Sequence, residues 1–141
     1  MEKYIHKVQY YETDKMGITH HSNYIRWMEE ARVDFLDKIG FGYARLEAEG
    51  ISSPVIGIEC SYKNSTTFDD KVEIEVEVAE YTGVKLGISY VMTNKKNGNV
   101  ALIGKSMHCF TNSDGRPLNL RKVHPDFDAK LKELYKISNK E

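Results

Sequence analysis

The feature that most constrains the fold is a long amphipathic segment whose pattern runs from Tyr24 to Ile39 and is followed by Gly40. Its apolar residues recur at steps of three and four, which places them on one face of an α-helix. About 17 helical residues at a rise of 1.5 Å each make a rod roughly 25 Å long. The apolar positions are Tyr24, Trp27, Met28, Ala31, Phe35, Leu36 and Ile39. Because the only tryptophan of the chain is on this face, other elements must cover it.

Most of the chain after residue 54 has the pattern of β-strands. Residues 71–78 alternate strictly, with Val72, Ile74, Val76 and Val78 on one face and lysine or glutamate on the other. Further strands are expected at residues 3–11, 54–62, 84–93 and 100–110, a hairpin turn at 95–99, and short helices at 43–48 and from 125 onward. This order of elements predicts an α+β fold with a five-stranded, mainly antiparallel sheet.

The size and composition predict a single domain over residues 1–141. The net charge of −1 gives no reason to expect binding to nucleic acid or to an anionic membrane. No stretch approaches about 18 consecutive apolar residues, and the N-terminus lacks the apolar run of a signal peptide. Cys60 and Cys109 lie far apart and have no paired spacing. We therefore expect a cytoplasmic protein with reduced, inert cysteines and no membrane partner.

Residues 13–21, between the first strand and the long helix, have neither a strand nor a helix pattern. Asp14 and Gly17 mark a turn, and His21, Ser22 or Asn23 can cap the helix. The first backbone N–H groups of a helix have no partner within the helix and carry its positive dipole end. A carboxylate can act as a base or nucleophile, and a free amide can hold an oxyanion. This arrangement is therefore suited to acyl chemistry.

The segment Tyr11–Tyr24, together with residues 27 and 30–32 of the helix, resembles the signature of hotdog-fold acyl-CoA thioesterases. Within that group it is most similar to the 4-hydroxybenzoyl-CoA thioesterase-like family. The segment consists of Tyr11, Glu12, Thr13, Asp14, Lys15, Met16, Gly17, Ile18, Thr19, His20, His21, Ser22, Asn23 and Tyr24. Residues 62–70 and 115–117 are similar to the family as well, so the resemblance covers roughly residues 5–120.

The resemblance implies a hotdog fold, in which a curved sheet wraps one long central helix. It also implies a homodimer or homotetramer whose interface sites accept the acyl-pantetheine arm of acyl-CoA or acyl carrier protein. The catalytic carboxylate of the family corresponds to Asp14, and its oxyanion-binding backbone amide corresponds to His21. No cofactor and no metal are implied. Thr19 and His20 stand where many members have Val or Ile followed by an aromatic residue, so no acyl preference is carried over.

Other types of site fit the residues less well. The histidines at positions 6, 20, 21, 108 and 124 match no metal-ligand spacing. Asp14, His21 and Ser22 lack a Gly-x-Ser-x-Gly elbow, and adjacent histidine and serine side chains diverge at a helix start, so a nucleophilic triad is not expected. Glu30 and Arg32 are expected on a solvated or interface face of the helix. The basic residues that could contact CoA phosphates are scattered, and the sequence does not choose among them.

Two functions from different classes follow from this reasoning. The first is hydrolysis of an acyl-CoA thioester to a carboxylic acid and CoA, with Asp14 as nucleophile or general base and the His21 N–H as oxyanion donor. The second is a non-catalytic acyl-CoA-binding hotdog module, because a fold does not fix a function. Such sensors usually carry an added DNA-binding segment, which we do not expect here, and Asp14 favours catalysis. A hotdog dehydratase would need a histidine and an acidic partner in a different motif.

Overall fold

The structure is a computed structural model that describes residues 2–139. The chain forms two compact units. Unit 1 consists of Met1–Phe35, Cys60–Val76 and Tyr90–Gly104, and unit 2 of Leu36–Glu59, Glu77–Ser89 and Lys105–Glu141. The expectation of a single domain stays a prediction.

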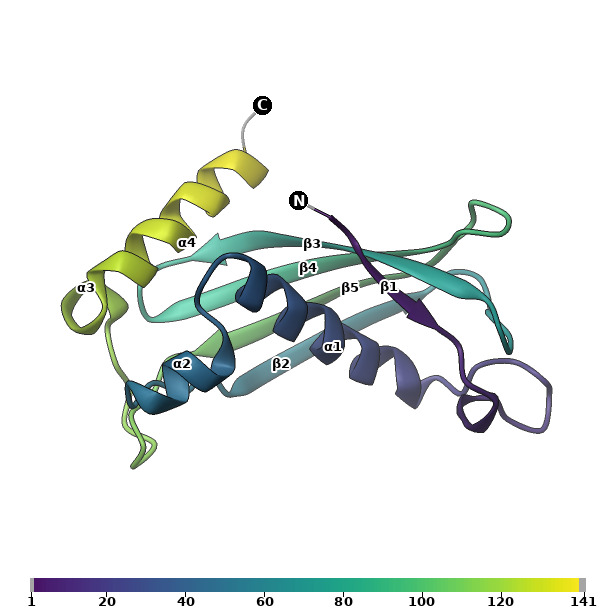
Figure 1. The fold of residues 1–141 in the computed structure, drawn as a ribbon, viewed down its shortest axis with the longest axis horizontal. Helices are drawn as coiled ribbons and strands as arrows, with labels where there is room; N and C mark the ends of the chain where they lie inside the picture. Colours follow the sequence, from purple (N-terminus) through teal and green to yellow (C-terminus); the bar gives the residue numbers. More distant parts are fainter. Residues whose placement is uncertain (1, 140–141) are drawn as a thin grey trace. The chain divides into compact units, whose positions relative to one another are not determined.

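Five strands form one sheet in the order β1-β3-β4-β5-β2 (Figure 1). The strands are β1 (Tyr4–Lys7), β2 (Val55–Tyr62), β3 (Lys71–Tyr81), β4 (Lys85–Asn94) and β5 (Val100–Cys109). β1 pairs with β3 in antiparallel register, with His6 opposite Val72. Tight turns join β3 to β4 and β4 to β5, and the latter is closed by a 2.9 Å hydrogen bond from the Asn94 N–H to the Asn99 carbonyl. Such short turns require antiparallel pairing. The α+β prediction with a five-stranded, mainly antiparallel sheet is confirmed.

The helices agree with the sequence pattern at most positions. They are the 3₁₀ helix η1 (Tyr10–Glu12) and the α-helices α1 (Ser22–Lys38), α2 (Tyr43–Ala48), α3 (Leu120–Val123) and α4 (Pro125–Ser138). α1 has 17 residues, and Gly40 behind it has a φ of +90°, a left-handed conformation that glycine adopts without a steric penalty. The four-residue α3 was not predicted. Among residues 2–139, no helix is long and apolar enough to cross a lipid bilayer.

In unit 1, the predicted apolar face of α1 is buried. Trp27, Met28 and Ala31 have no exposed surface. The Met28 sulfur lies 3.9 Å from Cys60 Sγ on β2. The prediction of a solvated or interface position is wrong for Arg32, which is 5% exposed. Its guanidinium Nη1 donates a 3.1 Å hydrogen bond to the Tyr90 hydroxyl on β4, which supplies a partner for the buried charge.

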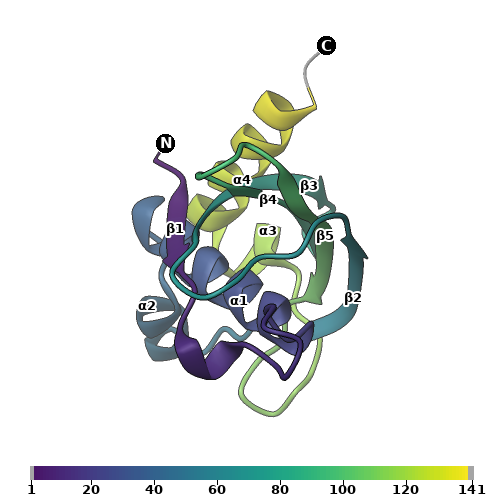
Figure 2. The same ribbon diagram turned by 90° about the vertical axis from the view of Figure 1, so that its right-hand side faces the viewer.

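The first strand is shorter than the predicted range of residues 3–11, because the chain turns after β1. The Gln9 N–H donates to Glu12 Oε1 at 2.8 Å, and the Glu12 N–H donates to the Gln9 carbonyl at 3.0 Å. The first bond caps the start of η1 with the Glu12 side chain, and the second is the backbone bond that closes the 3₁₀ turn. β1 itself lies beside α1 (Figure 2), where the Tyr4 hydroxyl donates to Glu30 Oε1 at 2.7 Å.

In unit 2, aromatic side chains hold the start of α4. The Phe127 ring stacks on Phe41 at a centroid distance of 4.8 Å and meets Phe110 edge-on at 5.9 Å. His124 caps the helix, because its Nδ1 accepts the Phe127 N–H at 3.3 Å. Phe127 and Leu131 are buried, as the predicted apolar side of this helix requires.

Candidate active site

Asp14 lies in a tight hairpin between η1 and α1. Thr13 and Thr19 pair in antiparallel fashion at its base, and the Asp14 N–H donates to the Ile18 carbonyl at 2.8 Å. Gly17 has a φ of +81°, which a side chain would disfavour. The side-chain oxygen Oδ1 of Asp14 accepts the Met16 N–H at 2.8 Å. No donor among residues 2–139 hydrogen bonds to the other oxygen, Oδ2, so this oxygen is available to water or to a substrate.

The His21 N–H is the free amide at the start of α1. The neighbouring amides are occupied: the Ser22 N–H donates to His20 Nδ1 at 3.2 Å, and the Asn23 N–H donates to the His20 carbonyl at 3.0 Å. The Tyr24 N–H donates to the His21 carbonyl at 3.4 Å. Within the part of the chain that the structure describes, the His21 N–H has no hydrogen-bond acceptor. It is therefore the group at this helix terminus that can bind an oxyanion.

The serine at this helix start pairs with a different histidine from the one weighed in the sequence. Ser22 Oγ lies 2.8 Å from Nδ1 of His20. The His21 ring instead stacks against His20, with their centroids 4.3 Å apart. A triad of Asp14, His21 and Ser22 has no support in these contacts.

A pocket of about 240 Å³ opens beside His21. Aromatic rings form much of its wall, since Tyr62 meets Tyr24 edge-on at 5.6 Å and His21 at 6.3 Å. The Tyr62 hydroxyl donates to the His21 carbonyl at 3.4 Å. Burial and the neighbouring Cys60 raise the pKa of Tyr62, so the phenol stays protonated and keeps this donor. The lining residues are Ile18, Thr19, His21, Tyr24, Tyr62, Lys63, Asn64 and Ser65.

The structure brings one of the two predicted site residues into this pocket and leaves the other outside its lining. His21 lines the pocket, whereas Asp14 does not. Asp14 belongs to the hairpin whose far strand supplies Ile18 and Thr19 to the pocket wall. The carboxylate therefore lies on the same short loop as two lining residues but outside the lining itself.

The sequence analysis did not predict a buried polar cluster at the base of the hairpin, centred on Glu12. Glu12 is 4% exposed, and its carboxylate accepts three hydrogen bonds of 2.8 Å each, from His6 Nε2, the Gln9 N–H and the Trp27 indole N–H. Burial alone would raise the pKa of Glu12, but these three donors outweigh it and hold the pKa below its ordinary value. The only signal in the sequence was a glutamate, a histidine and a tryptophan that each need a partner when buried.

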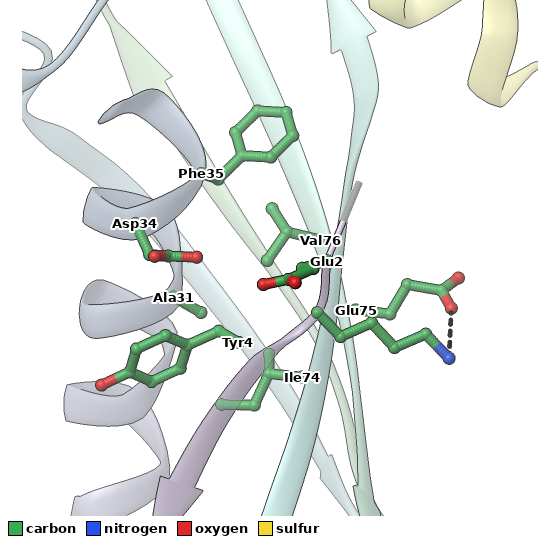
Figure 3. Close-up of a pocket in the computed structure, with 9 residues that line it drawn as sticks. Glu2, Tyr4, Ala31, Asp34, Phe35, Ile74, Glu75 and Val76 are labelled. Carbon is green, nitrogen blue, oxygen red and sulfur yellow. Dashed lines mark ion pairs between the residues drawn. The ribbon is translucent and has the colours of Figure 1, made fainter. Parts of the chain in front are cut away.

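A second hollow of about 130 Å³ involves β1, α1 and β3 (Figure 3). Figure 3 shows the carboxylates of Glu2 and Asp34 pointing toward one another. The Lys3 ammonium lies 3.3 Å from Glu75 and 3.5 Å from Glu73. The hollow holds neither Asp14 nor His21, and its acidic rim disfavours a ligand with phosphate groups.

The remaining histidines and cysteines do not combine into a site. His108 lies 2.8 Å from Ser106 Oγ, and His124 lies 3.0 Å from Glu49 Oε1. Cys60 and Cys109 are both free thiols. Over residues 2–139, no group of three or more histidine, cysteine, aspartate or glutamate side chains is arranged to hold a metal ion.

Comparison with known proteins gives one consistent result. Residues 8–133 match the family described as the Thioesterase-like superfamily. The putative acyl-CoA thioesterase YneP of Bacillus subtilis (strain 168) is 32% identical over 131 residues, which cover 92% of this chain and 94% of that protein. The acyl-CoA thioester hydrolase YbgC of Escherichia coli O6:H1 is 29% identical over 91 residues, 64% of this chain and 68% of that protein.

Solved structures show the same relationship in three dimensions. The crystal structure of a DHNA-CoA thioesterase from Staphylococcus aureus superposes with a TM-score of 0.92 at 32% sequence identity. The match covers 98% of this chain and 93% of that one. This agreement over nearly the whole chain confirms the predicted hotdog fold.

Proposed function

The chain belongs to the thioesterase-like superfamily, and from this premise we propose that it hydrolyses an acyl-CoA thioester with Asp14 as the essential carboxylate. The chain is a thioester hydrolase, in agreement with its relatives named acyl-CoA thioesterase and acyl-CoA thioester hydrolase. The proposal adds the residues that carry the reaction. The observation that supports it best is the free His21 N–H beside an aromatic pocket, on the same loop as a carboxylate with an available oxygen.

In the general-base route, Asp14 takes a proton from water while the water oxygen attacks the thioester carbonyl carbon. The carbonyl oxygen becomes an oxyanion and accepts a hydrogen bond from the His21 N–H, a type of contact that typically lowers a barrier by about 3 kcal/mol. The tetrahedral intermediate then expels the CoA thiolate, which receives the proton from Asp14. The products are a carboxylic acid and a free thiol, and Asp14 is regenerated.

In the nucleophilic route, an oxygen of Asp14 attacks the same carbonyl carbon and the thiolate leaves, which gives a mixed anhydride. Water then hydrolyses the anhydride and restores the carboxylate. Both routes use the His21 N–H in the same way, and both need the negative charge of Asp14. Neither route requires a cofactor.

An aromatic acyl group is the substrate class that the pocket favours. Tyr62, which is 48% exposed, and the exposed His21 ring offer faces and edges on which a planar ring can stack. The volume of about 240 Å³ accommodates one small ring system. The structural relative from S. aureus is named for a DHNA-CoA substrate, which supports this choice.

The proposal includes a homodimer or homotetramer in which a second copy completes each site, with residues 1–141 acting as one domain. The position of Asp14 outside the pocket lining supports it, because a further wall contributed by a partner subunit would enclose both groups in one site. β2 is an edge strand of the sheet, and Val55 and Ile56 on it are 45% and 53% exposed. Apolar edges of this kind are usually covered. Acyl carrier protein remains the alternative donor of the thioester, and a cytoplasmic location stays a prediction.

The test is a panel of aromatic and aliphatic acyl-CoA thioesters with detection of the released thiol. We expect turnover of aromatic substrates by the wild type and by Asp114→Asn, which changes an exposed turn aspartate. We expect severe loss of turnover in Asp14→Asn. A wild-type protein that binds acyl-CoA without releasing thiol would instead be the non-catalytic binding module.

A further inference from the structure

We propose that Glu12 is a positioning residue for thioester hydrolysis, which fixes the Asp14 carboxylate relative to the His21 N–H. This inference rests on the proposed function and adds to it a residue outside the pocket lining. Glu12 acts through its side chain and its backbone carbonyl, and each holds a different end of the hairpin that carries the two site groups.

The carboxylate of Glu12 attaches the base of the hairpin (residues 13–19) to β1 and α1. One oxygen, Oε1, accepts hydrogen bonds from His6 Nε2 on β1 and from the Gln9 N–H, and the other, Oε2, accepts the indole N–H of Trp27 on α1. Trp27 has no exposed surface, and the His6 ring lies against it at a centroid distance of 4.4 Å. Glu12 is therefore fixed to both β1 and α1, and Asp14 follows it after only one residue.

The backbone carbonyl of Glu12 holds the other end of the hairpin. It accepts the His20 N–H at 2.8 Å and the Asn23 side-chain amide at 2.9 Å. His20 directly precedes His21, so this carbonyl determines where the His21 N–H lies. Glu12 thus connects the residue that leads into Asp14 with the residue that leads into the free amide.

The cluster continues away from the hairpin and makes Glu12 rigid. His6 Nδ1 lies 2.9 Å from Glu30 Oε1, which also accepts the Tyr4 hydroxyl at 2.7 Å. A reacting group held by such a supporting shell keeps its geometry, and a displacement of about 1 Å can cost about 10²-fold in rate. The position of Asp14 therefore depends on the buried carboxylate of Glu12.

The first experiment replaces Glu12 by glutamine. Glu12→Gln keeps the size of the side chain but has one acceptor oxygen, so its NH₂ group must face one of the N–H donors. We expect kcat to fall about 10- to 100-fold, within the cost of a misplaced reacting group, while KM changes little. The matched control is Glu49→Gln, which also removes a carboxylate from a histidine ring nitrogen, that of His124, and should keep wild-type kcat.

An NMR measurement can follow the hydrogen bond between the Trp27 indole N–H and Glu12 directly. The chain has one tryptophan, so its indole N–H gives a single resonance in a ¹H–¹⁵N spectrum. Loss of the bond to Glu12 should shift that resonance in Glu12→Gln but not in Glu49→Gln. An unshifted resonance together with wild-type kcat would overturn the proposal.

A double-mutant cycle separates this proposal from the proposed function. Because Glu12 acts through both Asp14 and the His21 N–H, Glu12→Gln should cause a clearly smaller fold-loss in an Asp14→Asn background than in the wild type. Losses that multiply would overturn the positioning role. Wild-type turnover in Asp14→Asn would overturn the proposed function, whereas an impaired Asp14→Asn with an unimpaired Glu12→Gln would overturn only the role of Glu12.

A second variant covers the case in which Glu12→Gln does not fold. Asn23→Ala removes one of the two donors to the Glu12 carbonyl and leaves the buried carboxylate intact. We expect a several-fold fall in kcat with KM unchanged. The control is Asn119→Ala, which removes an asparagine that caps α3 and should keep wild-type kcat. Wild-type kcat in Asn23→Ala would overturn the proposal.

Discussion

The Trp27 indole N–H donates a 2.8 Å hydrogen bond to Oε2 of Glu12, and both side chains are buried. Trp27→Ala removes a large core ring and one of the three donors to a buried carboxylate. We expect a loss of about 3–5 kcal/mol in the free energy of unfolding, the range for large aromatic truncations in a core. Urea denaturation measures it. Ile39→Ala, which changes a half-buried residue just after the end of α1, is the control and should cost less. Equal losses would show that the Trp27 ring is not a main part of the core.

The apolar face of α1 was predictable because its signal is local. Residues three and four apart must share a face of a helix, so burial of Trp27, Met28 and Ala31 followed from their spacing alone. The same pattern misplaced Arg32, since its buried position depends on the Tyr90 hydroxyl, which comes from a strand far along the chain. Contacts between residues far apart in the chain produce no periodic pattern in the sequence.

The residues proposed for the candidate site could be named from the sequence, but the contacts that surround them could not. The residues Asp14 and His21 came from resemblance to a family, and the free amide followed from the general property of helix starts. The specific choice of the His21 N–H depends on His20 and Ser22, which occupy the neighbouring amides. The Glu12 cluster required β1 and α1 to be adjacent, which the alternation of one short strand does not reveal.

A pH-dependent contribution to stability is expected from Asp128 on α4. The Tyr81 hydroxyl donates to its Oδ1 at 2.5 Å, and Lys132 Nζ lies 3.0 Å from Oδ2. Burial alone would raise the pKa of Asp128, but Tyr81 and Lys132 outweigh it and hold the pKa below the ordinary 3.8. Since the folded state has the lower pKa, this stabilisation is complete above the unfolded pKa and is lost as the pH falls through the folded pKa.

The measurement is the free energy of unfolding from neutral pH down to acid. The wild type should lose more stability below about pH 4 than Asp128→Asn, because only the wild type has this carboxylate to protonate. Asp126→Asn, on the first turn of the same helix, is the control and should follow the wild type. Identical acid profiles for the wild type and Asp128→Asn would show that the pair with Tyr81 does not stabilise the fold.

Sedimentation should show at least a dimer. In the proposed assembly, a second copy covers the exposed apolar residues of the edge strand β2 and adds a wall to the pocket at His21. Ile56→Lys places a charge on that edge and should shift the population toward a 16.2 kDa monomer with reduced turnover. Val91→Lys changes a residue of similar type on β4, an interior strand of the sheet, and serves as the control. A monomer that hydrolyses thioesters at full rate would refute the interface site.

The catalytic role of Asp14 is tested by Asp14→Asn. Asparagine has nearly the same volume, suits the hairpin and can still accept the Met16 N–H, so the fold and the oligomeric state should survive. It removes the negative charge that either route needs, while the His21 N–H can still bind the carbonyl oxygen. We therefore expect kcat to fall at least about 10²-fold, the low end for general-base catalysis, with KM little changed. Steady-state kinetics on an accepted acyl-CoA measures both constants. A folded Asp14→Asn protein with near-normal kcat would exclude this carboxylate from the mechanism.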